Sequence, residues 1–155
     1  MNIFYLHKDP VIAAEMSCDK HVVNLEKTLY KAGWLKHPST QWLFESAFNY
    51  DWLYTHMMAL NEEYKKRYNH KEDHITIQKL GEVLKLPPIK FKNIFEPATE
   101  IKPAMPEHCK IKGNPVASYR KYYIIEKRRF AKWKSPAKTP QWFLDGISQQ
   151  QEVNI

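Results

Sequence analysis

Four chemically versatile side chains follow one another at Cys18, Asp19, Lys20 and His21. Ser17 or Asp19 suits the cap of a helix beginning here, and a helix start offers unpaired N–H groups and a positive dipole end that attract phosphate. Histidine can also orient or move a proton near neutral pH. The run therefore indicates either a phosphate-binding helix start or an aspartate cap beside a hydrogen-bonded core histidine.

A zinc site can be drawn from two other pairs of ligand-type residues. Cys18 and His21 stand three apart, and His108 and Cys109 are adjacent, which together supply two thiols and two imidazoles. Neither pair has the spacing of a regular zinc finger. Because the sequence shows no export signal, we expect the two thiols to be reduced and buried. We expect no metal and no other cofactor.

The positive charge of the chain is concentrated in one segment. Residues 116–138 hold eight Lys or Arg and one acid, and the whole chain has a formal net charge of +7. A concentrated basic stripe is typical of contact with a phosphate backbone, although it also occurs as a solvated helix face. Nucleic acid is the expected partner. The expected DNA-binding residues are Lys20, Arg120, Lys121, Arg128, Arg129 and Lys132.

Several common functional classes lack their motifs here. The sequence has no Gly-rich phosphate loop, no Gly-x-Ser-x-Gly elbow and no His-Glu-x-x-His, and no apolar run approaches membrane-spanning length. A set of aromatic residues offers surfaces on which bases could stack, but helical spacing of this kind is more typical of a core. The set comprises Trp42, Tyr50, Trp52, Tyr54, Tyr119, Tyr122 and Tyr123.

These residues must be positioned by helices. Four glycines and long segments with a helical period predict an all-α fold with a single compact domain, residues 1–155, built on a long central helix. That helix is predicted from Pro38 to Asn69, with Ser39 or Thr40 as its cap and Lys65, Lys66 and Arg67 at the negative end of its dipole.

Shorter elements are predicted to pack along this helix. Proline positions, caps and apolar periodicity define them. They are an N-terminal arm (1–6), a helix opened by Asp9 and Pro10 (to 16), a helix from 17 or 19 to about 33 that forms a hairpin with the central helix, a helix at 75–84, an extended Pro-rich wrapping loop (89–115), a basic helix opened by Asn114 and Pro115 (to 134), and a frayed tail (144–155).

The sequence resembles a family of small phage proteins over most of its length. The matching segments are MNIFYL, CDKHVV, NYDWL, EEYKKRY, AMP, SYRKYY and FAKW. This resemblance implies a protein that works in the cytoplasm of an infected host cell, and it implies no particular activity.

A second resemblance concerns chemistry. The Asp-x-His helix start, followed by a helical hairpin with a long second helix, resembles the pyrimidine-dimer DNA glycosylases of the endonuclease V type. This implies a compact helical protein that binds double-stranded DNA and flips a nucleotide out of the duplex. Its N-terminal amine then attacks the sugar C1′ to give a Schiff base. The implied catalytic residues are Met1 for attack, His21 for orientation and Glu26 for proton transfer.

The sequence departs from that pattern at two positions. The family glutamate seven residues after the helix histidine is Thr28 here, and Glu26 is the nearest carboxylate in that helix. Asn2 is too large for routine removal of the initiator, so Met1 is expected to be retained. Two alternatives follow: an enzyme that modifies a base or nucleotide without strand cleavage, or a non-catalytic phage protein that binds DNA or a host protein.

Overall fold

The computed structural model describes residues 3–23, 36–87 and 97–152. All regular elements in these residues are helical, which confirms the predicted all-α class. None of their helices is long and apolar enough to cross a membrane. In chain order the elements are α1 (Pro10–Glu15), α2 (Asp19–Val22), α4 (Pro38–Leu43), α5 (Ala47–Tyr68), α6 (Ile75–Leu80), the 3-10 turn η1 (Glu107–Cys109), α7 (Pro115–Tyr122), the π-helical turn η2 (Tyr123–Lys127) and α8 (Gln141–Glu152).

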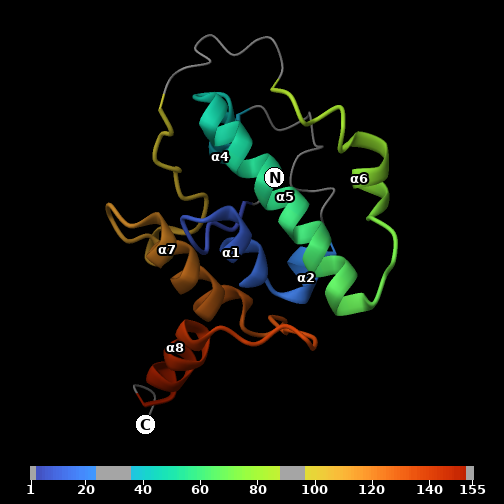
Figure 1. Ribbon diagram of the computed structural model, residues 1–155. Helices are drawn as coiled ribbons and strands as arrows, with labels where there is room; N and C mark the ends of the chain where they lie inside the picture. The colour runs from blue at the N-terminus through green and yellow to red at the C-terminus, as the bar shows by residue number, and fades with distance from the viewer. Residues whose placement is uncertain (1–2, 24–35, 88–96, 153–155) are drawn as a thin grey trace.

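The central helix α5 is present but begins later than its apolar periodicity predicts. A break separates it from α4, because Ser46 adopts extended backbone (φ −155°, ψ 145°) and its hydroxyl accepts a hydrogen bond from the N–H of Phe48 at 3.1 Å. Neither Ser39 nor Thr40 caps α4. The ring of His37 does so, by accepting from the N–H of Ser39 at 3.2 Å. With 22 residues, α5 still spans about 33 Å and crosses the centre of the molecule (Figure 1).

The first helix packs against α5 as its sequence allows. Asp9 caps α1 with Pro10 at the first helical position, as predicted. Ala13 and Ala14 are fully buried, and their small side chains let the two helices approach closely. Buried His56 of α5 hydrogen-bonds the carbonyl of Pro10 through Nδ1 at 2.9 Å. The start of α1 is therefore fixed to the middle of α5.

The described residues of the N-terminal arm lie on the core. Ile3, Phe4 and Leu6 are buried without forming a strand. They join a cluster built from α4, α5, α7, η2 and α8. Its other buried members include Trp42, Tyr50, Leu53, Tyr119, Tyr123 and Phe143.

The described part of the Pro-rich loop wraps the core as predicted. Ile101 is buried, and Trp42 donates from Nε1 to the carbonyl of Thr99 at 2.9 Å. The amide of Asn49 bridges this loop to α4, because it donates to the hydroxyl of Thr99 at 2.7 Å and to the carbonyl of Trp42 at 2.8 Å. Residues 89–96 of the predicted loop lie outside the described residues.

The C-terminal part of the chain differs from the prediction in two places, the end of the basic helix and the tail. Asn114 and Pro115 open α7 as predicted, but the helix expected to reach residue 134 ends in the π-helical turn at Lys127. The tail expected to fray from residue 144 is helical as far as Glu152. Its helix α8 is held by buried Phe143, whose ring lies 4.8 Å from that of Trp133.

The predicted hairpin can be followed only in part. Helix α2 forms at Asp19–Val22, and the rest of the segment expected to be helical to about residue 33 lies outside the described residues. Met1, Glu26 and Thr28 lie outside them as well.

Candidate active site and DNA-binding face

The carboxylate of Asp19 ties the start of α2 to other parts of the chain. Cys18 occupies the cap position and makes no side-chain cap, so neither Ser17 nor Asp19 plays the predicted capping role. The Asp19 carboxylate accepts hydrogen bonds from Nη1 of Arg67 at 3.1 Å and from the N–H of Lys134 at 3.0 Å. Asp19 therefore joins three separate parts of the chain and is not directed at a ligand.

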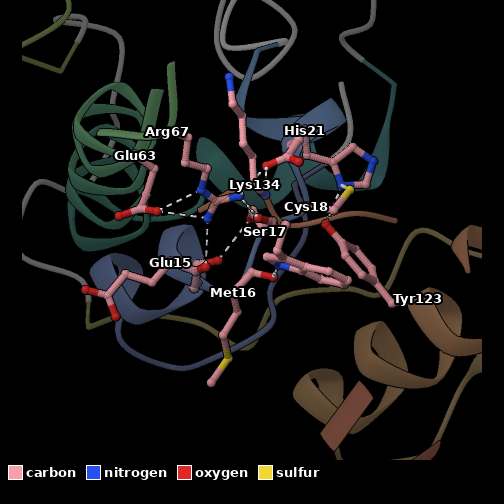
Figure 2. Close-up of polar contacts among 12 residues, drawn as sticks. Glu15, Met16, Ser17, Cys18, His21, Glu63, Arg67, Tyr123 and Lys134 are labelled. Carbon is pink, nitrogen blue, oxygen red and sulfur yellow. Dashed lines mark hydrogen bonds and ion pairs between the residues drawn. The ribbon is translucent and has the colours of Figure 1, made fainter. Parts of the chain in front are cut away.

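Arg67 is the centre of this clamp and lies in the last turn of α5, as predicted. Its side chain is fully buried and donates to the carbonyls of Glu15 (2.9 Å) and Ser17 (2.7 Å) in addition to Asp19. The remaining N–H groups pair with Glu63 one turn earlier, at 2.9 Å. Figure 2 shows these contacts on one side of the 15–21 segment. The i, i+4 spacing of Glu63 and Arg67 is the only sequence signal for this cluster.

His21 lies on the other side of the same segment, facing Cys18 and Tyr123 (Figure 2). Its Nδ1 shares a short hydrogen bond with the hydroxyl of Tyr123 and lies 3.6 Å from the sulfur of Cys18. Phe4 stacks on the imidazole with ring centroids 3.8 Å apart and planes 10° apart. The N-terminal arm and η2 therefore fix the orientation of this ring.

All three side chains in this cluster are neutral near pH 7. Burial, followed by the charges of Lys127 and Lys20, lowers the pKa of His21 to about 3. Burial also raises the pKa of the Cys18 thiol and raises the pKa of the Tyr123 hydroxyl well above its usual value. A neutral imidazole can orient or hydrogen-bond a substrate group, but it cannot act as a cationic acid here.

A basic and aromatic surface adjoins His21. Lys20 lies 4.4 Å from the ring centroid of Phe130, and Lys127 lies 4.4 Å from that of Tyr122 and 6.0 Å from that of Phe130. Arg129 and the ring of His21 are each 6.0 Å from Phe130 as well. We call this surface the Phe130 face; it comprises Lys20, His21, Tyr122, Lys127, Arg129 and Phe130.

This surface has the chemistry of a nucleic-acid contact. The cations Lys20, Lys127 and Arg129 can hold phosphates. They lie against the rings of Phe130 and Tyr122, and aromatic rings of this kind can also stack on bases. Lys127 and Phe130 were not among the expected DNA-binding residues. Their relation to Lys20 and His21 depends on the turn after η2, which brings the carbonyl of Lys132 within 2.8 Å of the N–H of Asp19.

The structure places the predicted DNA-binding residues in different surroundings. Lys20 and Arg129 belong to the Phe130 face, and exposed Lys132 is beside it through the backbone contact to Asp19. Arg128 is exposed and donates to Gln150 of α8 at 3.2 Å.

Two predicted residues, Arg120 and Lys121, are half-buried and lie apart from the Phe130 face. Arg120 donates to the carbonyl of Leu6 at 3.0 Å and lies 5.4 Å over the ring of Trp142, so it fastens the N-terminal arm to α8. Lys121 lines an open surface pocket of about 810 Å³ between α7 and α8, together with Trp142 and Asp145.

The aromatic residues mostly follow the core interpretation. Trp42, Tyr50, Tyr119 and Tyr123 are buried, whereas Tyr122 contributes to the Phe130 face.

The four-ligand zinc set drawn from the sequence is not assembled. Cys18 and His21 face Tyr123, whereas His108 and Cys109 lie beside Glu126.

Comparisons with known proteins support the resemblance to the glycosylases. Residues 1–76 match the family of pyrimidine dimer DNA glycosylases. No curated protein matches the chain, and no solved structure does. The matched segment holds the N-terminal arm, the Arg67 clamp and His21, while η2 and Phe130 lie beyond it. The match supports a glycosylase-like function in DNA repair, with DNA as the partner. Residues 1–76 of this chain carry the sequence pattern of the pyrimidine dimer DNA glycosylase family.

Proposed function

We propose that the protein is a phage-encoded DNA glycosylase of the pyrimidine-dimer type that extrudes a nucleotide from double-stranded DNA beside His21. The observation that carries this proposal is the junction of His21, which lies in the family-matched segment, with the cations and aromatic rings of the Phe130 face. Such a protein works in the cytoplasm of the infected host cell.

The Phe130 face supports binding to duplex DNA. Lys20, Lys127 and Arg129 would neutralise phosphates on either side of the lesion. Lys132 and Arg128 extend the positive charge beyond them. Phe130 and Tyr122 would stack against the bases next to an extruded nucleotide, which offsets part of the free energy of unstacking.

The proposed reaction uses the N-terminal amine of Met1, which is partly neutral near pH 7. Its nitrogen forms a bond to C1′ of the deoxyribose as the C1′–N bond to the base breaks, and the base leaves with the bonding electron pair and takes up a proton. The attached nitrogen then loses a proton, and the C1′–O4′ bond of the sugar ring breaks as O4′ takes up a proton, which leaves a protonated Schiff base at C1′. Phe4 lies on His21, and Met1 is three positions before Phe4 in the sequence, so chain length keeps the Met1 Cα, which carries the amine, within about 11 Å of the Phe4 Cα.

His21 and Glu26 complete the proposed machinery. The neutral imidazole, held by Phe4 and Tyr123, would orient the sugar or base through a hydrogen bond. Glu26 would move the proton, in place of the family glutamate whose position is occupied by Thr28. Subsequent cleavage of the strand at the Schiff base would make the protein a lyase as well.

One observation favours a second candidate. Because Thr28 replaces the family glutamate, the same face is also suited to binding or modifying an extruded nucleotide without strand cleavage. If catalysis is lost altogether, the protein would only bind DNA or a host protein.

The proposal is tested by equilibrium binding to three duplexes: undamaged, with an abasic site, and with a thymine dimer. A fluorescent 2-aminopurine opposite the lesion reports extrusion. We expect tighter binding to the damaged duplexes and a rise in fluorescence. The double variant Lys20→Ala/Arg129→Ala should weaken binding by about tenfold or more. Lys79→Ala, an exposed lysine of α6, is the matched control. Equal binding by both variants would exclude the Phe130 face as the DNA contact.

A further inference from the structure

A cluster of three different ligand types lies away from His21, where the wrapping loop meets η2. His108 Nε2 is 2.9 Å from Oε1 of Glu126, and the sulfur of Cys109 completes a group whose ligand atoms all lie within 4.8 Å of one another. Cys109 is fully buried, whereas His108 and Glu126 are exposed to solvent at their outer sides.

The backbone holds these ligands in place before any ion arrives. The N–H of Cys109 donates to the carbonyl of Pro106 at 3.0 Å, which closes η1. The hydroxyl of Ser118 on α7 accepts from the N–H of Ile111 at 2.8 Å, and the hydroxyl of Tyr119 accepts from the N–H of Ala104 at 3.3 Å. The loop is therefore fastened to α7 on both sides of His108 and Cys109.

The third ligand comes from an unusual element. Glu126 lies in the π-helical turn, and such turns are rare and frequent at functional sites. An α-helix continued through this segment would place residue 126 in a different direction, because a π-turn adds about one residue per turn.

We propose that His108, Cys109 and Glu126 bind one divalent cation of the zinc class, with its fourth position occupied by water. Imidazole, thiolate and carboxylate are the three side-chain types that Zn²⁺ accepts, and three protein ligands leave one coordination position open. Ligands of a tetrahedral Zn²⁺ lie about 3.3 to 3.8 Å apart, so only small movements of the exposed His108 and Glu126 side chains are needed.

Without an ion, the surroundings of Cys109 oppose the thiolate. Burial, and then the charge of Glu126, raises the pKa of the Cys109 thiol, while Lys121 and Lys127 lower it. A divalent cation between sulfur and carboxylate replaces their repulsion with attraction, and Cys109 releases its proton to solvent as the ion binds. The ion would fasten the wrapping loop to η2, whose Lys127 belongs to the Phe130 face. The site does not depend on the proposed DNA chemistry.

The test is titration of the chelator-treated full chain with Zn²⁺ in competition with a chromogenic chelator, and with Co²⁺ to detect a thiolate-to-cobalt absorption band. We expect one ion per chain and a band that Cys109→Ser removes. His108→Ala, at a position whose side chain is 55% exposed, should lower the Zn²⁺ affinity by at least about tenfold. Cys18→Ser controls for the other thiol, and Glu107→Gln controls for an acid on the same turn; both should bind like the unaltered protein.

Two results would overturn the site. The first is no Zn²⁺ binding at micromolar concentrations, which would leave an ion pair between His108 and Glu126 over a buried thiol. The second is a cobalt band that persists in Cys109→Ser or disappears in Cys18→Ser, which would move the thiolate ligand elsewhere.

Discussion

At the scale of single residues, the most consequential side chain is the guanidinium of Arg67. It has no exposed surface and pairs with Glu63 and Asp19, while its other donors go to backbone carbonyls of the segment before α2. Arg67→Met should lower the free energy of unfolding by about 3 to 5 kcal/mol, because two carboxylates and two carbonyls lose their partner. Chemical denaturation measures this loss.

Lys66→Met is the matched control for that prediction. Lys66 is the residue before Arg67 on α5, pairs with the same Glu63 at 3.3 Å and is 56% exposed. Its substitution should change stability by less than about 0.5 kcal/mol. Equal losses in the two variants would show that Arg67 is not the clamp.

Two histidines make stability depend on pH. The folded pKa is about 4 for His56, because of burial, and about 3 for His21. Both lie below the unfolded value of 6.5, so the unfolded chain binds more protons and the free energy of unfolding falls as the pH drops below about 6.5. The slope is at most about 1.4 kcal/mol per pH unit for each histidine, down to its folded pKa.

His56→Gln isolates one of these contributions. Denaturation midpoints measured between pH 7 and pH 5 should fall less steeply in this variant than in the unaltered protein, because glutamine cannot take up the proton. NMR titration of the imidazole carbons should show His21 still neutral at pH 5. An imidazolium at His21 near pH 6 would contradict the burial of its ring.

At the scale of elements, the caps decide where helices begin. Ser46→Ala removes the acceptor at the start of α5 and should cost about 1 kcal/mol of stability, measured by thermal or chemical unfolding. Ser148→Ala on exposed α8 is the control, with an expected change within about 0.5 kcal/mol. Equal changes in the two variants would show that the hydroxyl of Ser46 does not stabilise the start of α5.

Sequence patterns predicted the elements whose signals are local. Asp9 with Pro10 and Asn114 with Pro115 opened helices as expected, since a cap and an N1 proline act within one turn. The break at Ser46 was missed, because apolar periodicity continues across it. Glu45, which lies in this break, accepts hydrogen bonds from the hydroxyl of Thr99 at 2.6 Å and from Lys102 at 2.7 Å, 54 and 57 residues away in the sequence.

The sequence predicted some residues of the candidate site but not how they come together. His21 and Lys20 were identified from the helix start, and Arg129 from the basic stripe. Their meeting at Phe130, and the contact of His21 with Tyr123 102 residues later, depend on how η2 ends α7. No periodicity in the sequence signals a π-turn, so neither Lys127 nor the alignment of Glu126 with Cys109 could be predicted.

At the scale of the whole molecule, the charge distribution predicts how DNA binding responds to salt. The Phe130 face offers three cations, so the logarithm of the binding constant should fall with the logarithm of salt concentration with a slope of about −3 or steeper. Lys20→Ala/Arg129→Ala should make the slope less negative by about 2, and Arg128→Ala/Lys132→Ala tests the wider basic stripe. A slope near zero for the unaltered protein would contradict phosphate-driven binding.

The central claim is that this fold brings an amine to a nucleotide extruded beside His21. It is tested most directly by borohydride trapping on duplex DNA that carries an abasic site or a thymine dimer, with intact mass of the N-terminus measured in parallel. We predict a covalent adduct that maps to the Met1 amine, decreases in Glu26→Gln and His21→Ala, and persists in Lys79→Ala. Tight binding to damaged DNA without any adduct would contradict the glycosylase mechanism, and absence of both binding and adduct would contradict the role in DNA altogether.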